Sequence, residues 1–145
     1  MPDGDGWTFE PKYDGIRVIA FVTKDAVRLV TRNGNDKTKQ FPEIAEALRT
    51  LGRKAERELV VDGEIIAVVD GEVARFQALQ DRMHVKDALA IEHFAETQPA
   101  AIVLFDILVD GPDILLEEPW TTRRKHLEQV LRRRTSQRLR LSESI

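Results

Sequence analysis

The sequence lacks cysteine, long apolar runs and any large excess of charge. Without cysteine, neither a disulfide framework nor a thiolate metal site can form. The apolar runs are too short to span a bilayer, and the N-terminal MPDGDGW lacks the basic and apolar regions of a signal peptide. The net charge of −3 gives no global attraction to nucleic acid, although a local basic face would suffice. We therefore expect a cytoplasmic protein without a membrane segment.

What is present is the composition of a globular domain. Hydrophobic residues make up 42% and charged residues 32% of the 145-residue chain, which is long enough to bury one core. No repeat or linker divides it, so residues 1–145 are expected to form one unit.

Alternating apolar residues and turn signals predict strands mixed with helices. Strands are expected at 16–22, 27–31, 58–69, 72–75, 100–109 and 139–141, the first two joined by a hairpin at 23–25. Four helices are expected. The first begins at Pro42 and stops at Gly52, the second carries Phe76, Leu79 and Met83 on one face, and the third covers 88–95. The fourth begins at a Thr121 or Thr122 cap, and its inner face carries Leu127, Val130 and Leu131. Hairpins between several strands favour an α+β fold, with mainly antiparallel sheet flanked by helices.

Charged residues occur on or beside the most apolar strands. A charge on a buried strand is costly unless it is paired or faces a cavity. One such residue is most often a satisfied ion pair, but several on separate strands indicate a shared polar pocket. The residues concerned are Lys12, Arg17, Arg32, Glu64 and Asp106.

Short motifs resemble, in order, those of the covalent nucleotidyltransferases. EPKYDGIR at 10–17 resembles ExKxDGxR, and TRNG at 31–34, DGE at 62–64 and FDIL at 105–108 follow. This superfamily comprises ATP-dependent DNA ligases, RNA ligases and mRNA capping enzymes. The connecting FPEI at 41–44 resembles bacterial ATP-dependent DNA ligases in particular. The resemblance spans the chain and implies an ATP-grasp-like nucleotidyltransferase domain.

The resemblance implies that Lys12 is the catalytic nucleophile. Its amine would attack the α-phosphate of ATP to form lysyl-AMP, AMP would pass to a DNA 5′-phosphate, and the 3′-hydroxyl would then displace AMP. The attacking amine has to be neutral, and burial or neighbouring cations favour that state.

The resemblance also implies a nucleotide-binding set and the cofactors ATP and Mg²⁺. A planar arginine suits phosphate binding, and a ring face suits a purine. The implied contacts are Glu10 beside adenine, Arg17 near ribose and phosphate, Arg32 on phosphate, Glu64 on the ribose hydroxyls or the metal, and Phe105 stacked on the base.

Other polar residues have a more structural interpretation. For Asp62 and Asp106 we favour bonds to the backbone or to a neighbouring arginine. Asp110-Gly111 is expected to be a plain turn and His126 a surface residue. The basic runs at 123–125 and 132–134 are either a solvated helix face, which we favour, or contacts to DNA phosphates.

Two later family motifs, Glu-Gly and Lys-x-Lys, are not found, nor is an oligonucleotide-binding domain. Residues 1–145 are therefore expected to be an adenylation domain truncated at its C-terminus. An RNA ligase or capping-type enzyme, and a non-catalytic nucleotide- or DNA-binding remnant, stay open as alternatives. The expected partners are nicked or broken duplex DNA and an end-joining polymerase or repair factor.

Overall fold

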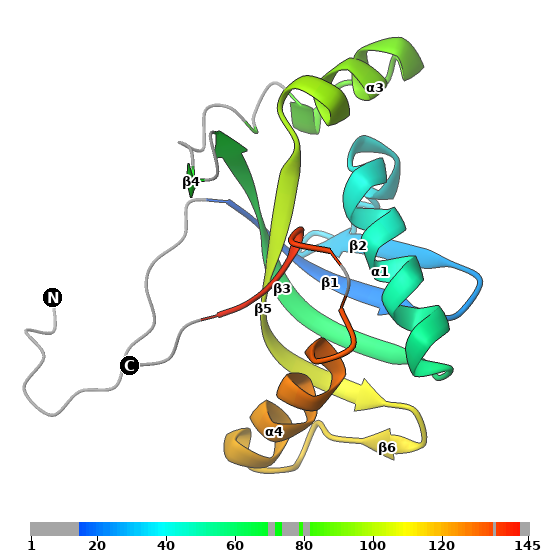
Figure 1. Cartoon of the computed structure of the whole chain (residues 1–145), viewed down its shortest axis with the longest axis vertical. Coiled ribbons are helices and arrows are strands. Elements are labelled where there is room, and N and C mark those ends of the chain that lie inside the picture. Colours follow the sequence, from blue (N-terminus) through cyan, green and yellow to red (C-terminus); the bar gives the residue numbers. More distant parts are fainter. Residues whose placement is uncertain (1–14, 70–71, 74–78, 80–81, 135, 143–145) are drawn as a thin grey trace, which may run out of the picture.

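A mixed sheet forms the centre of the molecule in the computed structural model, which describes residues 15–69, 72–73, 79, 82–134 and 136–142 (Figure 1). Its main path follows β2 (Val27–Thr31), β1 (Ile16–Val22), β3 (Leu59–Val69), β5 (Ala100–Asp110) and β6 (Asp113–Ile114). The short β4 (Glu72–Val73) pairs with β3, and β7 (Leu139–Leu141) pairs with β5. Of these pairs β5–β7 is parallel and the rest are antiparallel, which confirms the predicted α+β class.

Two helices cover one face of this sheet. Helix α1 (Pro42–Ala55) lies beside β1 and β2, and α4 (Trp120–Leu131) lies beside β5 (Figure 1). Their apolar residues join the inward residues of the strands in one core, because apolar side chains recur at helical spacing. The helical contribution comprises Ile44, Leu48 and Leu51 from α1 and Leu127, Val130 and Leu131 from α4. The predicted inner face of α4 is thus confirmed.

Two shorter helical elements are also bounded within the described residues. They are the 3-10 helix η1 (Thr38–Gln40) and α3 (Ala88–Thr97), which extends the predicted 88–95 and has no buried residue. No helix among the described residues is long and apolar enough to cross a membrane.

The predicted stop of the first helix at Gly52 is wrong. The helix continues to Ala55 and ends at Glu56, which takes the left-handed conformation at φ 57°. Gly52 lies inside the helix because the β1–β2 hairpin packs directly on it. A Cβ there would stand 2.7 Å from the Thr23 carbonyl oxygen and 2.8 Å from Val22 Cγ1. This glycine therefore permits close packing of helix on sheet.

The predicted threonine cap of α4 is also wrong. The helix begins at Trp120, and Pro119 occupies the N-cap without a side-chain hydrogen bond. The Pro119 carbonyl accepts hydrogen bonds from the backbone N–H of Thr122 and Arg123 at 3.0 and 3.1 Å. Proline suits this position because its fixed φ is already that of a helix start.

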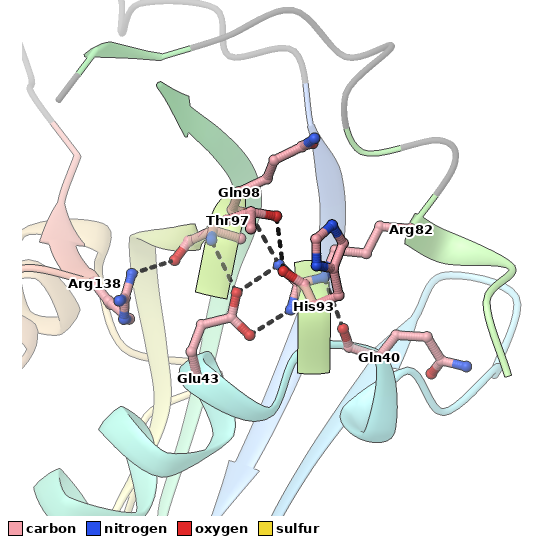
Figure 2. Close-up of polar contacts among 8 residues, drawn as sticks. Gln40, Glu43, Arg82, His93, Thr97, Gln98 and Arg138 are labelled. Atoms are coloured by element: carbon pink, nitrogen blue, oxygen red, sulfur yellow. Dashed lines mark hydrogen bonds and ion pairs between the residues drawn. The ribbon is translucent and has the colours of Figure 1, made fainter. Parts of the chain in front are cut away.

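A buried arginine ties the start of α1 to the start of β5 (Figure 2). Arg82 is 1% exposed and forms a two-pronged ion pair with Glu43, with one bond at 2.5 Å. It also donates to the carbonyl oxygens of Gln40 and Gln98 at 2.9 and 3.3 Å. Glu43 accepts a further bond from the Ala100 N–H at 2.9 Å. The network links three chain segments through one charge pair.

Asp110 is more than part of a plain turn, because it pairs with Arg57 and with His126, which was expected to be a surface residue. Asp110 is buried and accepts a hydrogen bond from Arg57 Nε. His126 Nδ1 lies 2.8 Å from its other oxygen, and the His126 side chain is only partly exposed. Burial raises the pKa of Asp110, but Arg57 and His126 outweigh it and hold that pKa below its usual value.

This cluster predicts a loss of stability in acid. A carboxyl group whose pKa is lower in the folded than in the unfolded state stabilises the fold. Its contribution is complete at pH values above the unfolded-state pKa and disappears as the pH falls through the folded-state pKa. We expect the urea midpoint of the chain to fall between about pH 5 and pH 3, around the ordinary aspartate pKa of about 3.9. Asp110→Asn should be less stable at pH 7 and show a flatter decline. The same change at exposed Asp113 is the control, and equal slopes for both variants would contradict the assignment.

Candidate functional site

The sheet face opposite α1 and α4 carries Arg17, Glu64 and Phe105 from three of the motifs, and we call it the site face. Register pairs Arg17 of β1 with Glu64 of β3, and Glu64 with Val103 of β5. Directly paired residues share a face, so these side chains form one row across three strands. Ile66, Ala101 and Val103 form a second, smaller apolar cluster there, against which Val68 and Phe105 pack. The site face therefore combines an apolar patch with opposite charges.

Arg17 is held in a fixed position on this face. Its Nε and Nη2 donate to the two carboxylate oxygens of Asp62, both at 2.8 Å. Its guanidinium carbon lies 5.0 Å from the centre of the Phe105 ring, within the range of a cation–π contact. The hydrogen bonds to Asp62 raise the pKa of Arg17, burial opposes the rise, and Glu64 and Asp106 add to it. Arg17 thus presents a permanent positive charge beside an aromatic ring.

Asp62 and Asp106 both bind arginines, as the sequence predicts. Asp106 accepts Arg123 Nε at 2.8 and 3.1 Å, and its Oδ1 also accepts the Ile107 N–H at 2.9 Å. The β3–β5 register shifts between Asp62 and Gly63. Such irregularities re-aim side chains next to functional sites.

The glycine of the Asp-Gly-Glu motif has a packing role. A Cβ on Gly63 would stand 2.6 Å from the Val103 carbonyl oxygen and 2.9 Å from Leu104 Cδ2. Any side chain would push β3 away from β5 and disturb the row that contains Glu64. The motif thus needs glycine to bring its glutamate beside the apolar patch.

The structure brings some of the predicted site residues together and leaves others apart. Arg17, Glu64 and Phe105 share the site face. Arg32 lies in the exposed turn after β2, whose last residue, Thr31, pairs with Val18 beside Arg17. The Arg32 side chain forms no ion pair with any residue that the structure describes. Glu10 and Lys12 lie outside the described residues.

Part of the basic run on α4 faces inward. Besides the Arg123 pair, Arg124 Nη1 donates to Ser142 Oγ at 2.7 Å, and Arg124 Nη2 bonds the Ser142 carbonyl. Arg124 also lies over the Trp120 ring at 5.8 Å. These two arginines hold α4 against the sheet, a role that the sequence alone did not indicate. Residues 125 and 132–134 are exposed.

The described residues fit a magnesium ion that depends on its substrate for most ligands. They contain no group of three or more histidine, aspartate or glutamate side chains able to hold a metal by themselves. Asp62 binds Arg17, and Glu64 is the carboxylate that the register places in the row between Arg17 and Val103. Mg²⁺ commonly binds one or two carboxylates together with substrate phosphates, and Glu64 suits that arrangement.

The mixed sheet, with Arg17, Glu64 and Phe105 on one face, is that of an α+β nucleotidyltransferase domain. Residues 2–145 match the family model of the ATP dependent DNA ligase domain. The chain belongs to this family, which confirms the resemblance found in the sequence.

Known relatives extend beyond the matched region. DNA ligase C1 of Mycolicibacterium smegmatis is 38% identical over 135 residues, which cover 90% of this chain and 38% of that protein. The bifunctional non-homologous end joining protein LigD of Bacillus subtilis is 35% identical over 133 residues, covering 90% of this chain and 22% of that protein. The solved structure of mycobacterial DNA ligase D complexed with ATP and MES has a TM-score of 0.72 at 27% identity, covering 95% of this chain and 40% of that one. The chain thus spans less than half the length of these relatives.

Proposed function

We propose that this chain carries the nucleotide-binding part of an ATP-dependent DNA ligase, with Lys12 as the residue that becomes adenylated. The observation that carries the proposal is the convergence of Arg17, Glu64 and Phe105 on one sheet face. These residues come from three strands and from three separate motifs. A purine would lie on the apolar patch, since a ring face and aliphatic side chains bind a base at little entropic cost.

The polar residues around the patch would orient the rest of the nucleotide. Glu64 would accept hydrogen bonds from the ribose hydroxyls or bind Mg²⁺, which when bound would neutralise phosphate charge. Arg17, kept charged and in place by Asp62, would lie near the ribose and the first phosphate. Arg32 would bind phosphate from the turn after β2. Glu10 would lie beside the adenine.

The chemical step would be an attack by the neutral Lys12 amine on the α-phosphate of ATP. The new N–P bond forms as the bond to pyrophosphate breaks, and the amine proton passes to solvent. A DNA 5′-phosphate would then displace Lys12 from AMP, and the 3′-hydroxyl of a nick would release AMP. Nicked or broken duplex DNA is the proposed partner, and the similarity to an end-joining protein supports a role in break repair.

Incubation with α-labelled ATP and Mg²⁺ tests the proposal. We expect label that stays on the protein after denaturation, and that added pyrophosphate removes from the native protein, because the transfer is reversible. Binding of ATP without label transfer would favour the non-catalytic alternative instead.

ATP should be strongly preferred to NAD⁺ as the adenylate donor. The first motif ends in Arg17, as in ATP-dependent ligases, and the matching family is the ATP-dependent one. We expect label from ATP to exceed label from adenylate-labelled NAD⁺ by at least about tenfold, which corresponds to roughly 1.4 kcal/mol. Equal labelling from both donors would contradict this prediction, and a competition titration with unlabelled NAD⁺ provides the control.

A further inference from the structure

A hollow opens on the site face, at the edge formed by β7. Its volume is about 410 Å³. Aliphatic residues from the ends of β3 and β5 lie on one side, and polar residues before and within β7 lie on the other. The lining residues are Val68, Pro99, Ala101, Ser136, Gln137, Arg138 and Arg140.

Register places both arginines on the site face. Leu139 pairs with Ile102 and is buried in the main core, so its neighbours Arg138 and Arg140 point to the opposite side of the sheet. Arg140 pairs with Val103. The row of Arg17, Glu64 and Val103 therefore continues to a second arginine on a fourth strand.

These two guanidinium groups lack the carboxylate partners that many other arginines of the chain have. The described arginines that pair with a carboxylate are Arg17, Arg28, Arg49, Arg57, Arg82, Arg123 and Arg124. Arg138 and Arg140 are partly buried, yet within the described part of the chain neither has an acidic group at ion-pair distance. Each donates one long bond of 3.4 Å to a backbone oxygen, Arg138 to Ala100 (Figure 2) and Arg140 to Gln137.

This arrangement favours an anion between the two side chains. Residues two apart on a strand are separated by about 7 Å, so two like charges there repel each other unless a counter-charge is present. Arginine has a planar fork of donors that matches phosphate oxygens. Ser136 and Gln137 add a hydroxyl and an amide at the same rim. Val68 and Ala101 offer an apolar surface on which a sugar or base can rest.

We propose that this hollow binds a phosphate group of a nucleic-acid strand. Arg17 and Arg140 lie three strand spacings apart, about 14 Å between their Cα atoms. If the nucleotide's phosphates lie at the Arg17 side, as in the proposed function, the phosphate at Arg138 and Arg140 is a different one. The phosphate site itself rests on the geometry of β7, and only its assignment to a strand rests on the proposed function.

Separate binding measurements on the 145-residue chain test this inference. The probes are a fluorescent, 5′-phosphorylated single-stranded oligonucleotide, followed by anisotropy, and ATP, followed by calorimetry. For the double variant Arg138→Gln/Arg140→Gln we expect roughly tenfold weaker binding of the oligonucleotide at low salt and unchanged ATP binding. The slope of log affinity against log salt should fall by about 0.7 for each phosphate that the variant no longer neutralises.

The matched control removes one charge from the opposite side of the sheet. Arg53→Gln, on exposed α1 surface, should leave both affinities and the salt slope unchanged. Near-UV circular dichroism establishes that each variant is folded, and Arg140→Lys, which retains the charge, should recover part of the oligonucleotide affinity.

The possible outcomes distinguish the phosphate site, its assignment to a nucleic-acid strand, and the proposed function. Equal oligonucleotide affinity for the double variant and the Arg53 control would overturn the phosphate site, as would undetectable oligonucleotide binding by the unaltered chain. A selective loss of ATP binding would overturn the assignment to a strand. Failure of label transfer from ATP, with the oligonucleotide effect intact, would overturn the proposed function and leave the phosphate site standing.

Discussion

Replacing Lys12 with alanine should abolish the transfer of label from α-labelled ATP to the protein. We expect a loss of at least about 10³-fold, since the substitution removes the amine that we propose as the nucleophile. ATP binding should fall far less, because the apolar patch, Arg17 and Glu64 are unchanged. The measurement is the initial rate of labelling in Mg²⁺, together with the Kd for ATP.

Two companion variants make this test specific to Lys12. Lys12→Arg keeps the positive charge, but a guanidinium stays protonated at neutral pH and cannot attack, so it should be equally inactive. Lys24→Ala removes an exposed lysine from the β1–β2 hairpin and should label normally. Undiminished labelling of Lys12→Ala would mean that another side chain is the acceptor.

Replacing Arg82 with alanine should produce the largest loss of folding stability. The change leaves the Glu43 carboxylate, whose side chain is only 9% exposed, without its charged partner. Removing one partner of a buried ion pair typically costs about 3–5 kcal/mol, a large share of the roughly 5–15 kcal/mol that stabilises an ordinary domain. The substitution also removes the guanidinium that lies 4.6 Å from the centre of the Phe41 ring. Urea unfolding followed by circular dichroism measures the effect.

The ion pair between Arg49 and Glu46, which lies at the surface of α1, provides the control for Arg82. Arg49 bonds Glu46 at 2.7 Å, but Glu46 is 61% exposed, so Arg49→Ala should cost no more than about 1 kcal/mol. Replacing Arg82 and Glu43 together by apolar residues should cost less than Arg82→Ala alone, because no buried charge remains unpaired. If Arg82→Ala were as mild as Arg49→Ala, the network would not be the link between α1 and β5.

Local patterns in the sequence were sufficient to predict most of the strands and to find the motifs. The runs at 16–22 and 27–31 are rich in apolar and β-branched residues with a polar turn between them, and the structure has strands with those same bounds. Alternation also predicts which face each side chain takes, because successive residues of a strand point to opposite sides. The expectation that Arg17 and Glu64 lie near each other came instead from the family resemblance, and the register of β1 and β3 is what pairs them.

Helix ends were harder to predict because their cause is not local. Gly52 reads as a helix stop from neighbouring residues alone, yet the helix continues through it, since the β1–β2 hairpin needs the space that a side chain would fill. Thr121 and Thr122 read as caps, but Pro119 already sets the first turn. Both errors arise from contacts or backbone constraints outside the pattern used to predict them.

By itself, the sequence determined the family, the α+β class and the order of the motifs, because short-range alternation and motif spacing are written along the chain. Only the tertiary structure decided which charges meet. Arg82 and Glu43 are 39 positions apart, and Arg17 and Asp62 are 45 apart, yet each pair is closed by the packing of distant segments. The same packing turns Arg123 and Arg124 inward and aligns Arg140 with Arg17. Pairing across a sheet depends on strand order and register, and no local pattern of residues specifies either.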